Sequence, residues 1–277
     1  MAGRDDDAYL SPPVQRAARL LRHIAEGDAV TNMARTGRTL GINRTTLLRL
    51  LRTLEAERFI EPRGPDIPGW RIGPGLIGMA AQAFFSEDLV QVAVPVLTGL
   101  AEQLGLSAHL GVLDGREVVY LIRRTPNHAF ASNIRVGSRL PAHAANMGRI
   151  ILAHLPPAQV AALYADAAMP AATAHTPTSP EDLRLRLEAD RAAGLAWSDG
   201  HYERGIGSVA AAVFDAAGGP VAAINVSGPA TLFSGERRRA QIGAAVGAAA
   251  EEISRRLGWH GPLRAPDAAR AERAVMA

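Results

Sequence analysis

Four residues in one short stretch, Arg44, Thr45, Thr46 and Arg49, have side chains that could bind nucleic acid. Arginine donates hydrogen bonds to phosphate oxygens and guanine edges, and threonine hydroxyls also reach phosphates and bases. Residues 11–75 hold 11 Arg against 6 acidic residues, whereas residues 76–277 hold 18 against 18. A basic segment beside a neutral one is typical of a DNA-binding module joined to a second module. The alternative is that these arginines only solvate a small helical domain.

A second group, Ser198, Asp199 and His201, contains the side-chain types of a hydrolytic triad. Residues this close in sequence seldom face each other in the order that a triad requires. The sequence also lacks a Gly-x-Ser-x-Gly elbow, a phosphate-binding loop and a His-Glu-x-x-His motif. It contains no cysteine, which excludes disulfides and cysteine-bound metals. We therefore expect no catalytic residue, no metal and no cofactor; a small hydrolase fused to a DNA-binding domain is the alternative.

Three predicted helices position the first group. Ser11-Pro12-Pro13 begins a helix that ends near Gly27, and Thr31 is expected to cap a second helix over 32–40. Asn43 then caps a third helix, which carries Arg44 to Arg49. The second and third helices predict a helix-turn-helix, because suitable side chains stand where such a unit fills the gap between its helices. These are Thr36, Leu40, Ile42, Leu47 and Leu50.

Gly37 is expected where the two helices of this unit approach most closely. Most such units have alanine there, and a glycine within a helix costs about 1 kcal/mol relative to alanine. Gly37 is therefore a mild departure from the pattern.

Two short strands after the third helix predict a wing. Phe59–Pro62 and Trp70–Ile72 are joined by a loop rich in glycine and proline, and Arg63 and Arg71 flank it. Arginines at a wing contact phosphates and add affinity that does not depend on base sequence. The candidate DNA contacts are Arg35, Arg38, Asn43, Arg44, Thr45, Thr46, Arg49, Arg63 and Arg71.

The stretch after the wing, from Pro74 to about Ser86, predicts a helix that is apolar around more than one face. Because it lies between two modules, we favour contact between two copies of the chain over a place in a core. The expected organisation is a DNA-binding domain over 11–73, a linker helix over 74–88, a second domain over 89–260 and a flexible tail over 261–277. The N-terminus is acidic and no run of 18 apolar residues occurs, so we expect no membrane contact and a cytoplasmic protein.

The second domain is predicted to be α+β with an antiparallel sheet. A helix over 90–104 precedes strands 107–113 and 117–123, which the hairpin turn Asp114-Gly115 joins. Strands 208–214 and 221–227 meet across Gly218-Gly219. Helices over 144–154 and 181–193 lie between the two hairpins, which gives the domain its α+β class.

One face of the second hairpin carries small and polar side chains. They are Ser208, Ala210 and Ala212 from one strand and Ala223, Asn225 and Ser227 from the other. If this face points inward, it leaves space and offers hydrogen bonds, as a small-molecule pocket does. If it points outward, it is the solvent face of a half-exposed sheet.

Several stretches of the chain resemble the isocitrate-lyase-regulator (IclR) family. In the second domain they are Gly137-Ser138-Arg139-Leu140-Pro141-Ala142-His143 with Gly148-Arg149, Arg191 and Gly194 ahead of Ser198-Asp199, and Gly205-Ile206-Gly207-Ser208 with residues 222–229. Residues 44–51 resemble the recognition helix of the same family. The resemblance implies a winged helix-turn-helix domain, a linker helix and a GAF-like or profilin-like effector-binding domain, assembled as a homodimer or homotetramer.

The resemblance also implies an effector site. Carried onto matching positions, its residues are Asn146, Met147, Gly148, Ser198, Asp199, Ser208, Asn225 and Ser227, and His109 is added because it shares a strand face with Ser107 and Gly111. Asn146 and Met147 are larger than the small pair often present, Ser208 stands where some members have cysteine, and Asn225 where others have serine. The expected effector is therefore a small organic acid or aromatic derivative that need not be glyoxylate or pyruvate.

The function that these features imply is that of a ligand-responsive transcription regulator, in most members of the family a repressor of a catabolic or metabolic operon. Its expected partners are a double-stranded DNA operator and the small-molecule effector. The alternative is an architectural or oligomerising DNA-binding protein that senses nothing. That alternative predicts a filled core where the sensing hypothesis predicts a vacant cavity.

Overall fold

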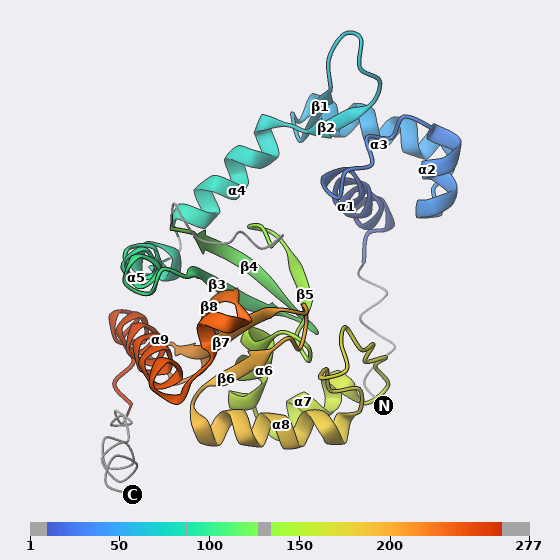
Figure 1. Ribbon diagram of the computed structural model, residues 1–277. Helices are drawn as coiled ribbons and strands as arrows, with labels where there is room; N and C mark the ends of the chain where they lie inside the picture. Colours follow the sequence, from blue (N-terminus) through green and yellow to red (C-terminus); the bar gives the residue numbers. More distant parts are fainter. Residues whose placement is uncertain (1–9, 87, 127–133, 262–277) are drawn as a thin grey trace, which may run out of the picture. The chain divides into compact units, whose positions relative to one another are not determined.

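The computed structural model describes residues 10–86, 88–126 and 134–261. The chain divides into two compact units, Met1–Ser86 and Glu87–Ala277 (Figure 1). The predicted tail, 261–277, lies outside the described residues from position 262 onward.

The N-terminal unit contains four helices and a small wing among its described residues. Its elements are α1 (Pro12–Ala25), α2 (Met33–Leu40), α3 (Arg44–Ala56), β1 (Ile60–Pro62), β2 (Trp70–Ile72) and α4 (Pro74–Ser86). The strands β1 and β2 pair antiparallel, with Glu61 opposite Arg71. Leu20 of α1 and Leu47 and Leu51 of α3 are fully buried in one apolar cluster. The predicted winged helix-turn-helix is confirmed.

The cap of α2 differs from the prediction. Asn32, not Thr31, is the N-cap residue, and its side-chain oxygen accepts a hydrogen bond from the Arg35 backbone N–H at 3.0 Å. Both residues are favourable caps, so composition alone did not separate them. The other two predictions at this turn are confirmed, since Gly41 ends α2 with a left-handed φ of 65° and Asn43 caps α3.

The packing of α2 requires glycine at position 37. Alanine, which the sequence analysis took to be the more stable residue here, is therefore expected to be the less stable one. A Cβ atom at Gly37 would lie 2.7 Å from the Ile42 carbonyl oxygen, which is a backbone atom and cannot turn away. Gly37→Ala is therefore expected to lower the free energy of unfolding of this unit by about 1–3 kcal/mol. Urea unfolding monitored by circular dichroism measures it. Gly78→Ala in α4 is the control, because nothing lies within 4 Å of its added Cβ and alanine there is expected to stabilise the helix slightly.

The C-terminal unit is built on one six-stranded antiparallel sheet with the order β5-β4-β3-β8-β7-β6. The first strands are β3 (Ser107–Asp114), β4 (Glu117–Arg124) and β5 (Arg139–Pro141), and the later ones are β6 (Ala196–Asp199), β7 (Ile206–Phe214) and β8 (Pro220–Pro229). The helices are α5 (Asp88–Leu104), α6 (Asn146–His154), α7 (Pro157–Tyr164), α8 (Pro180–Ala193) and α9 (Glu236–Arg256). The predicted α+β class with an antiparallel sheet is confirmed.

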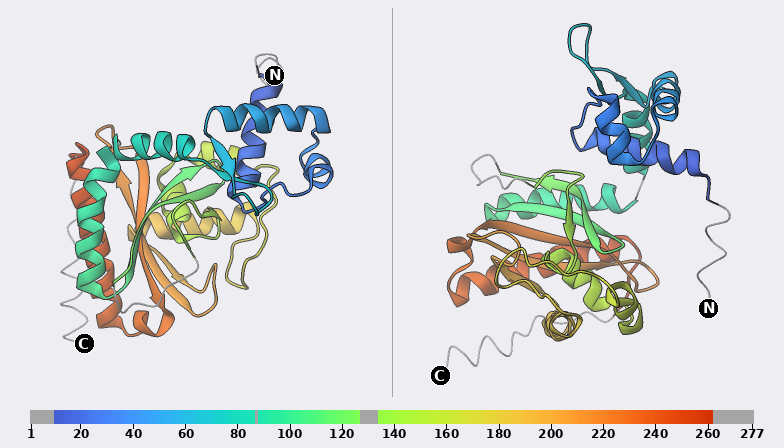
Figure 2. Two further views of the ribbon diagram at one scale, coloured as in Figure 1. Left: turned by 90° about the horizontal axis from the view of Figure 1, so that it is seen from above. Right: turned by 90° about the vertical axis from the view of Figure 1, so that its right-hand side faces the viewer.

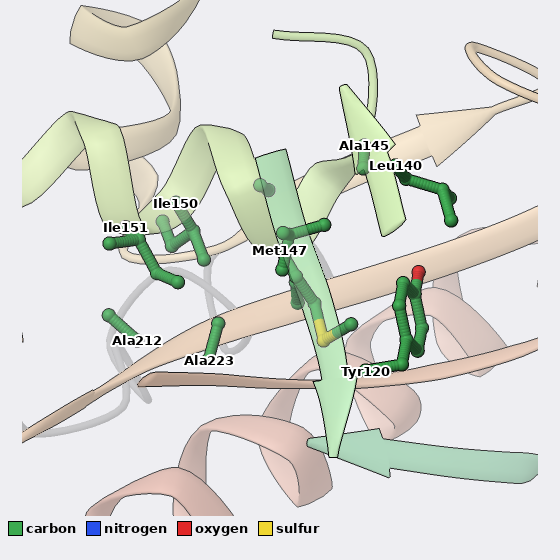
Figure 3. Close-up of a cluster of buried hydrophobic side chains, with 11 residues drawn as sticks. Tyr120, Leu140, Ala145, Met147, Ile150, Ile151, Ala212 and Ala223 are labelled. Atoms are coloured by element: carbon green, nitrogen blue, oxygen red, sulfur yellow. The ribbon is translucent and has the colours of Figure 1, made fainter. Parts of the chain in front are cut away.

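Helices cover both faces of this sheet. Figures 1 and 2 show α5 and α9 side by side on one face and α6, with α8 outside it, on the other. The strand face that carries Ala210, Ala212 and Ala223 packs against Ile150 and Ile151 of α6 (Figure 3). This is the face with the small and polar side chains, so it points inward. The alternative of a solvent face is wrong.

Candidate functional site

The exposed face of α3 holds the basic group that the sequence singled out. Leu47 and Leu51 turn into the core, which leaves Arg44, Thr45 and Arg49 on the solvent side. The first turn of α3 contains no acidic residue. The partial positive charge of a helix N-terminus therefore adds to the arginines, an arrangement that suits phosphate binding.

The other DNA-contact candidates differ in how free their side chains are. Arg35 forms an ion pair with Asp28 at 3.0 Å, and Arg71 forms one with Glu61 at 2.7 Å. The Asn43 oxygen accepts from the Thr46 backbone N–H at 2.8 Å, which engages it in capping. Four of the six candidate arginines form no ion pair with another described residue: Arg38, Arg44, Arg49 and Arg63. No carboxylate of a described residue holds the guanidinium groups of these four.

The C-terminal unit contains a cavity of about 40 Å³ between the N-terminal end of α6 and the sheet. Six of the nine predicted effector residues line it: His109, Asn146, Ser198, Ser208, Asn225 and Ser227. All six are buried. The structure therefore brings together residues that are separated by more than a hundred positions in the sequence.

The polar residues of this cavity are joined in one hydrogen-bonded chain. His109 Nδ1 lies 2.9 Å from Asn225 Oδ1, and Asn225 Nδ2 donates to Asn146 Oδ1 at 3.1 Å. Asn146 Nδ2 donates in turn to Ser208 Oγ at 3.0 Å and to the Ala196 carbonyl oxygen at 3.2 Å. Three of these members, Asn146, Ser208 and Asn225, stand at positions where this chain departs from the resembled family. The members of the hydrogen-bonded chain come from strands β3, β7 and β8 and from the first turn of α6.

Three predicted effector residues lie outside the cavity lining. Met147 turns from α6 into the apolar cluster (Figure 3), and its side chain lies close to Gly111. Gly148 lies against Ala142 so closely that a Cβ would approach its backbone to 2.4 Å, so its role is close packing. Asp199 is exposed and pairs with Arg239 at 3.3 Å.

Seven further residues complete the lining and were not among the candidates. They are Tyr120, Ile134, Leu140, Ala145, Tyr202, Glu203 and Ile206. Val118, Tyr120 and Ile122 share the buried face of β4, but Val119 and Leu121 on the other face are also apolar, so the sequence offers no alternation that would assign Tyr120 to the cavity. Figure 3 shows the Tyr120 ring beside Leu140. Tyr202 and Glu203 lie on the loop between β6 and β7, where no periodicity indicates direction.

Ser198, Asp199 and His201 do not form a catalytic triad. The Ser198 hydroxyl accepts from the His201 backbone N–H at 3.2 Å, and His201 Nδ1 accepts from the Asp199 backbone N–H at 3.2 Å. The Asp199 carboxylate faces Arg239 instead of the imidazole. A triad needs the carboxylate on one imidazole nitrogen and the serine hydroxyl on the other.

Two buried histidines predict a loss of stability in mild acid. Burial lowers the pKa of His109 and of His201 from 6.5 to about 4. Between these values the unfolded chain binds protons that the native chain does not, so the free energy of unfolding should fall as pH drops. The slope is at most about 1.4 kcal/mol per pH unit for each histidine.

Urea unfolding between about pH 6.5 and pH 5 measures this slope. His109→Phe is expected to make it shallower, and the exposed His260→Phe is the control. If His109→Phe leaves the slope unchanged, His109 does not contribute to the loss of stability in acid.

Within the described ranges, no group of three or more His, Asp or Glu side chains is placed to hold a metal ion. No helix in the described part of the chain is long and apolar enough to cross a membrane.

Two family models match the chain, one for each unit. The model of the IclR helix-turn-helix domain matches residues 13–64, and that of the bacterial transcriptional regulator IclR C-terminal domain matches residues 81–255. The transcriptional repressor IclR of Escherichia coli (strain K12) is 29% identical over 241 residues, which cover 86% of this chain and 87% of that protein.

Solved structures agree with the family models. An IclR transcriptional regulator from Alicyclobacillus acidocaldarius matches with a TM-score of 0.80 at 27% identity, over 90% of this chain and 100% of that one. An IclR homolog from Microbacterium hydrocarbonoxydans, complexed with 4-hydroxybenzoate, matches with a TM-score of 0.76 at 25% identity, over 88% and 98%. The predicted family and the predicted role in DNA-binding regulation are confirmed. The chain belongs to the IclR family of bacterial transcriptional regulators.

Proposed function

We propose that this protein represses a catabolic or metabolic operon in the cytoplasm and that a small organic acid or aromatic derivative controls its binding to the operator. The proposed organisation is a DNA-binding domain over 11–73, a linker helix over 74–88 and an effector-binding domain over 89–260. The observation that carries the sensing half is the cavity beside α6, which buried polar side chains line. A polar cavity in an otherwise close-packed interior is the usual feature of a small-molecule site.

The DNA half of the proposal rests on α3 and the wing. Arg44 and Arg49 present free guanidinium groups on the exposed face of α3, as a recognition helix in the major groove requires. We expect Arg38 and Arg63 to contact phosphates, because neither forms an ion pair with another described residue. Arg35 and Arg71 are weaker candidates because carboxylates already hold them.

The proposed assembly is a homodimer or homotetramer. Ile77 and Met79 of α4 are 57% and 56% exposed. Large apolar side chains that are this exposed favour contact with a partner. A second copy of the chain related by two-fold symmetry would place two recognition helices on a pseudo-palindromic operator.

The size of the cavity implies that an effector must enlarge it. One water molecule needs roughly 10–15 Å³ of such space, so about 40 Å³ holds a few waters at most. Tyr202, on the loop between β6 and β7, is 38% exposed and is the most exposed of the described residues that line the cavity. A ligand that stabilises the enlarged state shifts the conformational equilibrium, and the same coupling acts between ligand and DNA.

Thermal unfolding with a panel of small carboxylates and aromatic acids tests the sensing proposal. The panel includes 4-hydroxybenzoate, which the homolog from Microbacterium hydrocarbonoxydans binds in its structure. A compound at about a hundred times its Kd should add about 2.7 kcal/mol of stability and raise the Tm by several degrees. Asn225→Leu should abolish this rise, because it removes two hydrogen bonds of the cavity wall.

Arg184→Ala is the control for this test, since its side chain is exposed on α8 and lies outside the lining. A compound that stabilises Asn225→Leu as much as the wild type would move the effector site elsewhere. If no compound stabilises any variant, the architectural alternative is favoured.

A further inference from the structure

In the hydrogen-bonded chain around the cavity, one backbone atom determines which group donates and which accepts in each bond. The Ala196 carbonyl oxygen can only accept, so the amide nitrogen of Asn146 must face it. The oxygen of Asn146 then faces Asn225 and can only accept the N–H that Asn225 donates. Each side-chain amide along the chain is therefore oriented by its neighbour.

This direction sets the proton position on His109. With its nitrogen engaged by Asn146, Asn225 presents its oxygen to His109 Nδ1, so Nδ1 must carry a hydrogen. Burial keeps the imidazole neutral at pH 7, because it lowers the pKa to about 4. A neutral imidazole has one N–H, and Nε2 is consequently a hydrogen-bond acceptor.

His109 Nε2 is an acceptor without a donor. The His109 side chain is 1% exposed and lines the cavity, and its Nε2 is buried with no partner among the described residues. At the other end of the chain, Ser208 Oγ accepts from Asn146, so its own hydrogen is not needed for that bond. A buried acceptor left unpaired is unfavourable, and a group that pairs with it gains affinity.

We propose that the effector carries a hydroxyl or N–H group that donates a hydrogen bond to His109 Nε2, and that this donor is required for tight binding. The inference rests on the sensing function proposed above. It makes His109 the residue that determines specificity within the cavity, and it defines the effector as a hydroxylated or amino-substituted small molecule.

The charges of the wall support this class of ligand. Among the lining residues described, no arginine is present and Glu203 is the one acidic group. A carboxylate has no hydrogen to donate at neutral pH and would place its lone pairs against that of Nε2. An effector that contains a carboxylate therefore turns another group toward His109. A ligand without a donor would also displace any water that donates to Nε2 and leave the atom unpaired.

The first test needs no ligand. Heteronuclear NMR of the nitrogen-labelled protein distinguishes a protonated ring nitrogen from an unprotonated one, and comparison with His109→Phe assigns the signals. We expect Nδ1 protonated and Nε2 unprotonated at neutral pH. A proton on Nε2 would overturn the inference, because the atom would then be a donor.

The second test compares ligands of equal size that differ in one donor. The pairs are para-hydroxybenzoate and para-aminobenzoate against para-toluate, and lactate against isobutyrate, with Kd measured by calorimetry on the full chain. For at least one pair the donor compound should bind the wild type about tenfold or more tightly than its methyl analogue. His109→Phe should reduce that ratio to near one. His143→Phe should keep the ratio, because His143 is buried but lies outside the lining.

The outcomes separate the two proposals. Equal binding of donor and methyl compounds by the wild type, or a preference that survives in His109→Phe, overturns the inference and leaves the sensing function standing. If no compound of either kind binds, the sensing function fails and the inference falls with it, even with Nε2 unprotonated. If His109→Phe does not fold, the NMR result and the wild-type ratio decide.

Discussion

Replacing both Arg44 and Arg49 by alanine is expected to weaken operator binding at least about thirtyfold, because each arginine contact to a base edge or phosphate is worth about 1–3 kcal/mol. Both side chains are exposed on α3, and neither forms an ion pair with another described residue. Their loss should not disturb the core, which Leu47 and Leu51 form from the opposite face. The effect should therefore appear in DNA affinity and not in the free energy of unfolding.

Fluorescence anisotropy with a duplex selected by the wild-type protein from a random-sequence pool measures this affinity. Titrations at several salt concentrations should show a shallower dependence of log Kd on log salt, by about one for each phosphate contact removed. The control removes two exposed arginines of the C-terminal unit, Arg184→Ala with Arg255→Ala. If the control loses as much affinity as the test variant, net charge and not α3 is responsible.

A third variant tests the ranking among the arginines. Arg71 is already engaged by Glu61 at 2.7 Å, so part of its interaction with a phosphate would replace an existing ion pair. Exposed ion pairs contribute little, about 0–1 kcal/mol, and the loss on Arg71→Ala should accordingly be smaller than that on Arg44→Ala. A larger loss for Arg71 would place the wing, not α3, at the centre of the interface.

The N-terminal unit could be predicted from the sequence because its signals are local. Caps, helix stops and apolar spacing act within a few residues of one another, so Gly41 and Asn43 could be placed correctly. The cap at Asn32 was missed because two good capping residues stand side by side there. The requirement for glycine at position 37 was missed for a different reason. A Cβ there is excluded by the Ile42 carbonyl oxygen, which is a backbone atom, and the residue types in a sequence do not show where backbone atoms lie.

The cavity could be predicted only in part because it combines strands with a helix. Strand alternation has a period of two, so the order of residues along each strand was enough to assign Ser208, Asn225 and Ser227 to one face. That this face points inward is known only from the position of α6, which covers it. On α6 the neighbours Asn146 and Met147 diverge by about 100°, since a helix has 3.6 residues per turn. The sequence could not tell which of the two faces the cavity.

A buried ion pair holds α6 in the orientation that turns Asn146 into the cavity. Arg149 of α6 is fully buried, and its Nε donates to Asp190 Oδ2 of α8 at 2.9 Å, while Nη2 donates to the Trp197 carbonyl oxygen at 2.6 Å. These bonds join α6 to α8 and to β6. Burial of two charges is unfavourable by itself, so the pair is stable only while both partners and their hydrogen bonds are present.

Asp190→Ala is accordingly expected to lower the free energy of unfolding of the C-terminal unit by about 3–5 kcal/mol, because it leaves the Arg149 guanidinium buried without its carboxylate. Urea unfolding followed by tryptophan fluorescence measures the loss. The double variant Arg149→Met with Asp190→Leu should recover most of the lost stability, since it removes both charges and fills the same space. Arg184→Met on the exposed face of α8 is the matched control and should change stability by less than about 1 kcal/mol.

If the double variant is no more stable than Asp190→Ala, the cost lies in lost packing and not in the unpaired buried charge. If Asp190→Ala costs no more than the exposed control, the pair does not hold α6 in place.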